Sequence, residues 1–379
     1  MDLELSETQR ALRDLVRDYV TQRVIPEAAR WEEERWIPDA VFRELGELGL
    51  LGLPFPEEYG GSGLDTISLA LAIEELARGD ASLALSVAAH ISLGCTPIFR
   101  FGDEEQKRTY LVPAAQGEIL AAFGLTEAEA GSDAGATRTT AVATGDGWLI
   151  TGRKVFITNG SRAGVVTITA VTDPDRGKDG ISNFIVPRGT PGFTAKRPYQ
   201  KLGLHASDTA ELIFDDCRLP AASLLGQRGR GFRNFLEVLD GGRIGIGALS
   251  VGIAQACLDA ALRYAKQRHQ FGRPIGKFQA IQFKLADMAT QIDAARLLVY
   301  RAAWLKDRGR DYRTAAAKAK LFASEIAERA ALEAVQIHGG WGYMREFNVE
   351  RYLRDVKLMT IGEGTSEIQR LVIARGLGL

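Results

Sequence analysis

The stretch AGVVTITAVTD, residues 163–173, is where the hydrophobic period of the chain falls to two. Val166, Ile168 and Ala170 alternate there with threonines. Successive side chains of a strand point to opposite faces, so this alternation predicts a strand with one apolar face. The β-branched residues that fill the stretch are those that strands favour. The middle of the chain therefore predicts a sheet.

The neighbouring segments have the same character. WLITGRKVFITNG (148–160) and ISNFIVPRG (181–189) are rich in β-branched and aromatic residues. The pair Asp146-Gly147 between two such runs is a typical hairpin signal. We expect an antiparallel sheet domain, or a small barrel, over residues 121–222.

Helical patterns lie on both sides of this region. Ser6 and Gln9 have the spacing of a capping box at the start of the first helix, and Asp65 and Asp80 are expected N-caps. Further helices are expected at 38–48, 65–78, 81–101, 104–112, 229–268, 279–308, 313–338, 346–359 and 366–376, with stops at Gly309 and Gly339-Gly340. Strands and helices do not alternate, which excludes a doubly wound sheet. We predict an α+β chain with an N-terminal helical domain (1–120), a middle antiparallel β-domain (121–222) and a C-terminal helical domain (223–379).

Composition excludes several classes of function. The 47 basic and 48 acidic residues nearly cancel, so no basic field indicates a nucleic-acid partner. Three well-separated cysteines lack CxxC spacing and fit a reducing cytoplasm. The N-terminus predicts no signal or presequence, and we expect no apolar run of the roughly 20 residues that span a bilayer, hence no stable membrane insertion.

Several well-known ligand-binding motifs are matched only in part by this sequence. Gly245 and Gly247 begin a dinucleotide-like pattern, but Ser250 stands at the next glycine position and no strand precedes it. In GRPIGKF (272–278), Phe278 replaces the magnesium-binding hydroxyl of a phosphate loop. The four histidines have no HExxH spacing. We therefore expect neither a Rossmann site, a phosphate loop nor a metal.

Four short segments combine glycines with polar or aromatic residues. They are LTEAEAGSDAGA (125–136), FITNG (156–160), RHQFGRPIGKFQAIQ (268–282) and QIHGGWGYMREF (336–347). The first could approach a phosphate or ring edge, the second could bracket a flat heterocycle, and the third suits a pyrophosphate and adenine. Taken singly, each also fits a surface loop, a half-buried strand, a helix hairpin or a helix stop.

Together with TIGEGTSEIQR (360–370), these segments stand in the order and at the separations of one family. Over nearly its whole length the chain resembles the acyl-CoA dehydrogenases. The resemblance implies an FAD enzyme with a C-terminal four-helix bundle, assembled as a homotetramer from two dimers. It also implies oxidation of an acyl-CoA to the trans-2-enoyl-CoA, with an electron-transfer flavoprotein as the acceptor.

By this resemblance Glu363 is the base that removes the pro-R α-proton, while flavin N5 accepts the β-hydrogen as hydride. The flanking glycines let the carboxylate reach the α-carbon. The N–H of Glu363 is expected to bind the thioester carbonyl, which stabilises the enolate-like charge. An apolar pocket should raise the pKa of this carboxyl toward working pH.

The resemblance also implies the cofactor and substrate contacts. The FAD contacts in the middle domain are Phe123, Leu125, Thr126, Gly131, Ser132, Phe156, Ile157 and Thr158. Those expected from a neighbouring subunit are Arg268, Phe271, Gln279, Gln336, Ile337, Gly339 and Gly340, while Thr365, Ser366 and Glu367 close over the cofactor. The expected substrate contacts are Ser132, Asp240, Arg243, Glu363 and Gly364.

Three positions depart from the common family pattern. Ala128 replaces a proline, Phe156 a tryptophan, and Gly362 an aromatic residue that often precedes the base. The last change widens the pocket and leaves acyl length and branching open. Gly242, where the isovaleryl and long-chain branches carry their glutamate, places the base as in the short- and medium-chain branches. The rival hypotheses are an acyl-CoA oxidase and a catalytically silent FAD-binding scaffold, and the intact Glu363 disfavours the scaffold.

Overall fold

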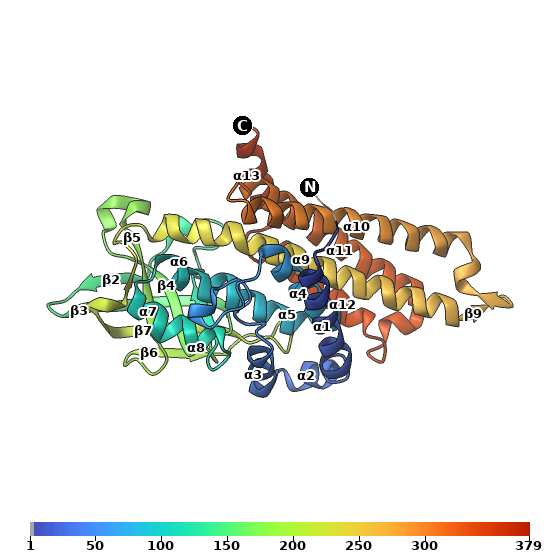
Figure 1. The fold of residues 1–379 in the computed structure, drawn as a ribbon, viewed down its shortest axis with the longest axis horizontal. Helices are drawn as coiled ribbons and strands as arrows, with labels where there is room; N and C mark the ends of the chain where they lie inside the picture. Colours follow the sequence, from blue (N-terminus) through green and yellow to red (C-terminus); the bar gives the residue numbers. More distant parts are fainter. Residues whose placement is uncertain (1–3) are drawn as a thin grey trace.

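The computed structural model describes residues 4–379 and has a sheet region at one end and a long helical region at the other (Figure 1). Helices come first in the chain, strands follow, and helices return. Helices from both halves of the chain share one hydrophobic core, and the sheet has a second, smaller core of its own. This architecture confirms the predicted α+β class.

The N-terminal region begins with the expected cap. Ser6 and Gln9 form the predicted capping box, and Asp65 and Asp80 accept hydrogen bonds as N-caps. The α-helices are α1 (Glu7–Tyr19), α2 (Ala28–Glu34), α3 (Asp39–Glu47), α4 (Thr66–Gly79), α5 (Ala81–Ala89), α6 (Thr96–Phe101), α7 (Glu104–Gln106) and α8 (Val112–Ala115). Four short helical segments are η1 (Val20–Val24), η2 (Glu57–Tyr59), η3 (His90–Cys95) and η4 (Lys107–Leu111). The expected helix at 81–101 is thus interrupted by the π-turn η3, a distortion common near functional sites.

The strands form one open sheet in the order β6-β7-β3-β2-β4-β5-β8, with β1 beside β4. They are β1 (Ala121–Gly124), β2 (Thr140–Ala143), β3 (Gly147–Thr158), β4 (Val165–Val171), β5 (Ile181–Pro187), β6 (Phe193–Lys196), β7 (Thr209–Pro220) and β8 (Leu224–Leu225), with short turns η5 (Ala134–Ala136), η6 (Pro174–Gly180) and η7 (Ala221–Ser223). The purely antiparallel prediction was wrong in one respect, since β1 and the start of β2 pair with β4 in parallel. Long connections separate these strands in the chain, as parallel pairing requires.

The predicted hairpin is present one residue earlier than expected. Ala143 pairs with Trp148, and the N–H of Thr144 donates to the carbonyl of Gly147 at 2.8 Å. Gly145 and Asp146 are therefore the two loop residues. The hairpin joins β2 to β3, and β3 ends at the Phe156–Thr158 segment.

The C-terminal region consists of long helices. They are α9 (Gly231–Gln267), α10 (Gln279–Asp307), α11 (Arg313–His338), α12 (Val349–Val356) and α13 (Ser366–Gly376), with β9 (His269–Gln270), β10 (Arg273–Pro274), η8 (Ile275–Lys277), η9 (Gly339–Tyr343) and η10 (Lys357–Thr360) between them. Gly309 and Gly339 follow helices with φ of 62° and 60°, as expected of helix stops. The expected helix at 346–359 is divided into α12 and η10.

Two helical segments are more apolar than the sequence analysis expected. Ala81–Phe101 and Gly231–Gln267 each contain a window apolar enough to cross a membrane, which corrects that expectation. In both windows, 78% of the residues are buried inside the protein. α9 packs on α4, α10 and α11, so its apolar character serves the protein core.

Candidate active site

Glu363 lies in the short loop between η10 and α13. It has φ of 52°, a left-handed conformation uncommon outside glycine, and Gly364 follows with φ of 95°. The turn directs the carboxylate at α9, where Gly242 leaves the room for it. A Cβ atom at Gly242 would lie 2.2 Å from Oε2 of Glu363. The left-handed backbone of Glu363 and the absence of a side chain at Gly242 together fix the position of this carboxylate.

The carboxylate of Glu363 is buried and only partly neutralised. Burial raises its pKa to about 7, against the positive charges of Lys320 and Arg243. Oε2 has no hydrogen-bond partner within the described residues. A buried acceptor without a partner carries a free-energy penalty, and such groups concentrate at functional sites. This carboxylate can take a proton near neutral pH.

The loop that carries Glu363 is held from two helices. The ammonium of Lys320 on α11 and the side-chain amide of Gln369 on α13 each donate to the carbonyl of Gly364 at 2.8 Å. Lys320 is fully buried, and burial lowers its pKa to about 8 despite the opposing charge of Glu363. The sequence analysis missed both residues. A lysine on the alanine-rich buried face of α11 was the available signal for one of them.

The predicted substrate contacts on α9 bind each other. Arg243 pairs with Asp240, whose other oxygen accepts a hydrogen bond from Arg313 of α11 at 3.0 Å. Arg243 is nearly fully buried, yet its Nε has no partner in the described part of the chain. Ser366 Oγ and Gln369 Oε1 are buried without partners too. These polar atoms lie on the two helices that flank Glu363 and remain available to a ligand.

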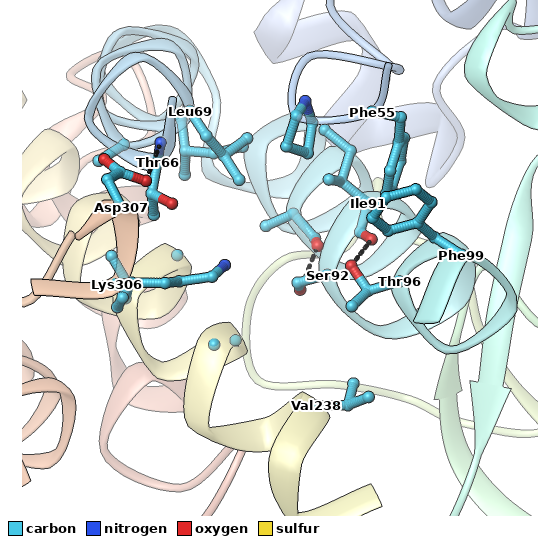
Figure 2. Close-up of a pocket in the computed structure, with 18 of the residues that line it drawn as sticks. Phe55, Thr66, Leu69, Ile91, Ser92, Thr96, Phe99, Val238, Lys306 and Asp307 are labelled. Carbon is cyan, nitrogen blue, oxygen red and sulfur yellow. Dashed lines mark hydrogen bonds between the residues drawn. The ribbon is translucent and has the colours of Figure 1, made fainter. Parts of the chain in front are cut away.

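A cavity of about 270 Å³ borders Gly242 (Figure 2). Its walls come from the loop before η2, from α4, η3 and α6 on one side, and from α9 and the end of α10 on the other. Most of the lining is apolar, with Phe55, Leu69, Ile91, Phe99 and Val238 among its members. The cavity therefore suits an apolar group that lies against Gly242, beside the carboxylate of Glu363.

The predicted FAD contacts of the middle domain lie together. The N–H of Val155 on β3 donates to the carbonyl of Thr126 at 2.8 Å, so the segment after β1 runs beside the end of β3. Phe123 and Ile157 are buried; Leu125, Thr126 and Thr158 are partly exposed, and Gly131 and Ser132 are exposed. Phe156 is 63% exposed, and its ring lies 5.0 Å from that of Tyr199.

A buried ion pair anchors the loop that carries Gly131 and Ser132. The ammonium of Lys154 lies 2.7 Å from Glu127 and also donates to the Leu125 carbonyl at 3.2 Å. Glu127 accepts hydrogen bonds from the backbone of Arg138 and Thr139 at the other end of the loop. Both ends of the loop are thereby fixed to β3.

The second group of predicted FAD contacts is not brought to this region within one chain. Phe271 stands between β9 and β10 at the far end of the helical region from the sheet (Figure 1). His338, beside Gly339, stacks on Tyr264 near the end of α9. Arg268, Phe271, Gln279, Gln336, Gly339 and Gly340 are exposed, while Ile337 is buried. Thr365 caps α13, next to buried Ser366 and exposed Glu367.

Three family descriptions match the chain in order. They are the N-terminal domain of acyl-CoA dehydrogenase over residues 6–118, the middle domain over 122–217 and the C-terminal domain over 229–378. The chain belongs to the acyl-CoA dehydrogenase family. The probable acyl-CoA dehydrogenase YngJ of Bacillus subtilis (strain 168) is 57% identical over 378 residues, 100% of both proteins.

Solved acyl-CoA dehydrogenases share the same fold. Butyryl-CoA dehydrogenase from Megasphaera elsdenii superposes with a TM-score of 0.98 at 45% identity, covering 100% of each chain. A glutaryl-CoA dehydrogenase from Mycobacterium smegmatis in complex with FADH2 has a TM-score of 0.94 at 35% identity, covering 98% of this chain and 95% of the other. The chain is therefore an acyl-CoA dehydrogenase.

The residues present fit the FAD that acyl-CoA dehydrogenases use. The ring of Phe156 offers an exposed flat face beside the backbone of Thr126 and Thr158. A Cβ atom at Gly131 would meet nothing within 4 Å, so a phosphate could approach the backbone there. No cluster of three metal-ligating side chains occurs among residues 4–379.

Proposed function

We propose that this dehydrogenase oxidises short acyl-CoA thioesters to trans-2-enoyl-CoA, with Glu363 as the base and FAD as the cofactor. The observation that carries the proposal is the buried Oε2 of Glu363, which has no partner and faces the helix that lines an apolar cavity. The butyryl-CoA dehydrogenase of the same fold supports a short acyl chain.

The loop around Glu363 provides two groups for the reaction, the carboxylate and the backbone N–H of Glu363. The carboxylate accepts the α-proton, for which a pKa of about 7 is well matched to neutral pH. The backbone N–H of Glu363 donates to no carbonyl within the described residues, and is free to bind the thioester oxygen. That hydrogen bond would stabilise the negative charge that develops as the proton leaves.

FAD would be held by the loop at Gly131 and Ser132 and by Phe156 and Thr158, and when bound it supplies the hydride acceptor. The ring of Phe156 would cover one face of the cofactor. Arg268, Phe271, Gln279 and Gln336–Gly340 would reach the cofactor only from a second copy of the chain, since they lie at the other end of their own. We therefore propose a homotetramer, with an electron-transfer flavoprotein as the electron acceptor.

The compartment is part of the same proposal. Cys95, Cys217 and Cys257 are all free and buried. Unpaired cysteines are typical of a reducing environment. We propose the cytoplasm.

Anaerobic bleaching of the yellow holoenzyme tests the function. Acyl-CoA thioesters from C4 to C16, straight and branched, are added to protein of matched FAD content, and the absorbance of the oxidised flavin is followed. We expect rapid bleaching by C4 to C6 chains. A yellow protein that none of them bleaches would refute the proposal and favour a scaffold, while rapid turnover with air alone would indicate an oxidase.

A further inference from the structure

Lys306 differs from the other charged side chains that line the cavity, because its charge has no partner in the described part of the chain. It lies at the end of α10, and its side chain extends into the cavity (Figure 2). Within residues 4–379 its ammonium has no hydrogen-bond or ion-pair partner. Burial lowers the pKa of Lys306, against the opposing charge of Asp307. An unpaired cation therefore faces a mostly apolar space.

The other charged side chains of the cavity, and the hydroxyls of Ser92 and Thr96, have partners within residues 4–379. Ser92 and Thr96 donate to backbone carbonyls of their own helical segment. Asp307 accepts a hydrogen bond from the backbone of Thr66 at 2.9 Å. Arg100 is paired with Glu237. Lys306 is thus the charged side chain of this lining that still needs water or a ligand.

The position of Lys306 relative to the base can be bounded from α9. A Cβ atom at Gly241 would lie 3.4 Å from the ammonium of Lys306, and one at Gly242 would lie 2.2 Å from the carboxylate of Glu363. Consecutive Cα atoms are about 3.8 Å apart, so the two charged groups are separated by no more than roughly 13 Å. Lys306 lines the cavity, and Glu363 touches its wall at Gly242, so an acyl chain in this space lies within reach of both groups.

We propose that Lys306 sets the upper limit on acyl chain length in this dehydrogenase. The proposal rests on the function given above, because it takes the cavity beside Glu363 as the acyl site. An extended carbon chain advances by about 1.3 Å per bond of about 1.5 Å. A chain that starts about 3 Å from the carboxylate therefore meets the ammonium after roughly eight carbons at most.

The limit has a physical cause. Short chains leave the ammonium of Lys306 in contact with water inside the cavity. Longer chains must strip that water or push the side chain away, and an unpaired cation in apolar surroundings is strongly unfavourable. Each added methylene beyond the limit then loses the gain that apolar burial gives elsewhere in the cavity.

Substitution at position 306 tests the proposal. Lys306→Met keeps a long side chain without the charge, and Lys306→Arg keeps the charge. The measured quantity is the ratio of kcat/KM for octanoyl-CoA to that for butanoyl-CoA, at matched FAD content. We expect the ratio to rise by about tenfold or more in the Met variant, since single methylenes in apolar pockets discriminate by this order, and to stay at or below the wild-type ratio in the Arg variant.

The outcomes separate this inference from the proposed function. An unchanged ratio in Lys306→Met, or an equal rise in Lys306→Arg, overturns the role of the charge. Failure of the wild-type protein to be reduced by any acyl-CoA overturns the function itself. If the Met variant does not fold, binding of C4 to C12 enoyl-CoA to the wild-type holoenzyme, followed by the flavin spectrum, decides. Affinity should stop rising by about C8, and a steady rise to C12 overturns the limit.

Discussion

At the scale of the residue, Glu363 has three features that each raise the free energy of the folded state. Its backbone is left-handed, its carboxylate is buried, and Oε2 has no partner. A folded protein keeps such a combination where function requires it. Gly242 is part of the same arrangement, because any side chain there would collide with the carboxylate. Positions 242 and 363 are thus immediate neighbours across the wall of the cavity.

Replacing Glu363 by glutamine should change the rate of the reaction and the stability of the fold in opposite directions. We expect Glu363→Gln to lower kcat by at least about 10³-fold with FAD retained, since general base catalysis is typically worth 10²–10⁴-fold. Because burial raises the pKa of Glu363 above its unfolded value, ionisation at position 363 lowers the stability of the fold as the pH rises from about 4.5 to about 7, and the loss is complete above that. Gln should therefore raise the melting temperature at pH 8 but not at pH 4.5. Stopped-flow flavin reduction and thermal melts check both, and undiminished reduction would show that another residue is the base.

Lys320 should tune the base as well as hold its loop. Its charge opposes the burial that raises the pKa of Glu363. Catalysis needs the ionised carboxylate, so the acidic limb of the kcat/KM profile should move to higher pH by roughly one unit in Lys320→Met. Lys320→Arg, which keeps the charge, should leave the limb near its original position. Arg243 and Glu367 also contribute charge near this site, and neither is changed. An equal loss of activity at every pH would mean a structural role alone.

At the scale of the element, α9 packs in the protein core and also borders the active site. The small residues along this helix make both possible. Gly242 gives room to Glu363, whereas a Cβ atom at Gly245 on the same helix would lie 3.9 Å from Ala88, in ordinary contact. We expect Gly242→Ala to lower kcat by about tenfold or more, because displacement of a reacting group by ~1 Å can cost on the order of 100-fold. Gly245→Ala is the matched control and should have the smaller effect on kcat. Equal effects would show that helix packing alone is responsible.

The same contact allows the base to be moved. Glu363→Gly removes the carboxylate and the collision together, so Gly242→Glu becomes possible in that background. We expect the double variant to recover a measurable part of flavin reduction that the Glu363→Gly single variant has lost. Anaerobic single-turnover reduction, with FAD content matched, measures the recovery. Full activity in the single variant would contradict the assignment of Glu363.

The loop from Leu125 to Thr139 is the second functional element. Burial opposes both charges of the Lys154–Glu127 pair, yet hydrogen bonds and the opposite charge keep the pKa of Glu127 down at about 2. Lys154→Met would leave a buried carboxylate unpaired, which typically costs about 3–5 kcal/mol. We expect lower stability and loss of FAD, partly restored by adding Glu127→Gln. Denaturant unfolding and bound-flavin absorbance measure these effects, and retained FAD with native stability would contradict them.

Local patterns predicted these elements well and the site only in part. The period of two around Ile168 and the caps at Ser6, Asp65 and Asp80 act within a few residues, so the sequence carries them directly. The parallel pairing of β1 with β4 depends on partners far apart in the chain, and it was missed. Lys320 and Lys306 acquire their meaning only when α11 and the end of α10 pack against α9. The family resemblance located Glu363, but its contact with Gly242 joins distant parts of the chain and is seen only in the folded structure.

At the scale of the whole molecule, the predicted FAD contacts divide into two groups at opposite ends of one chain. The group at the far end includes Phe271, which is 91% exposed, and Tyr343, in η9 after α11, is 81% exposed. Large aromatic side chains left in water are characteristic of surfaces that bind a partner. A second copy of the chain would cover them and bring Arg268 to the sheet region of its neighbour. Cofactor binding and assembly would then be one event.

This arrangement predicts that the cofactor and the oligomer are lost together. Binding that spans two chains stabilises the assembly by linkage, so dilution of the holoenzyme should release FAD as the complex dissociates. Phe271→Asp places a charge in the proposed contact and should lower both the oligomer mass and the FAD content at the same protein concentration. Val142→Asp is the matched control, because Val142 on β2 is also an exposed apolar residue, 59% accessible, but lies in the sheet region. Sedimentation velocity with detection at the protein and flavin wavelengths measures both quantities in one run. A Phe271→Asp monomer that sediments with stoichiometric FAD would show that one chain holds the cofactor alone, and the second group of contacts would then need another role.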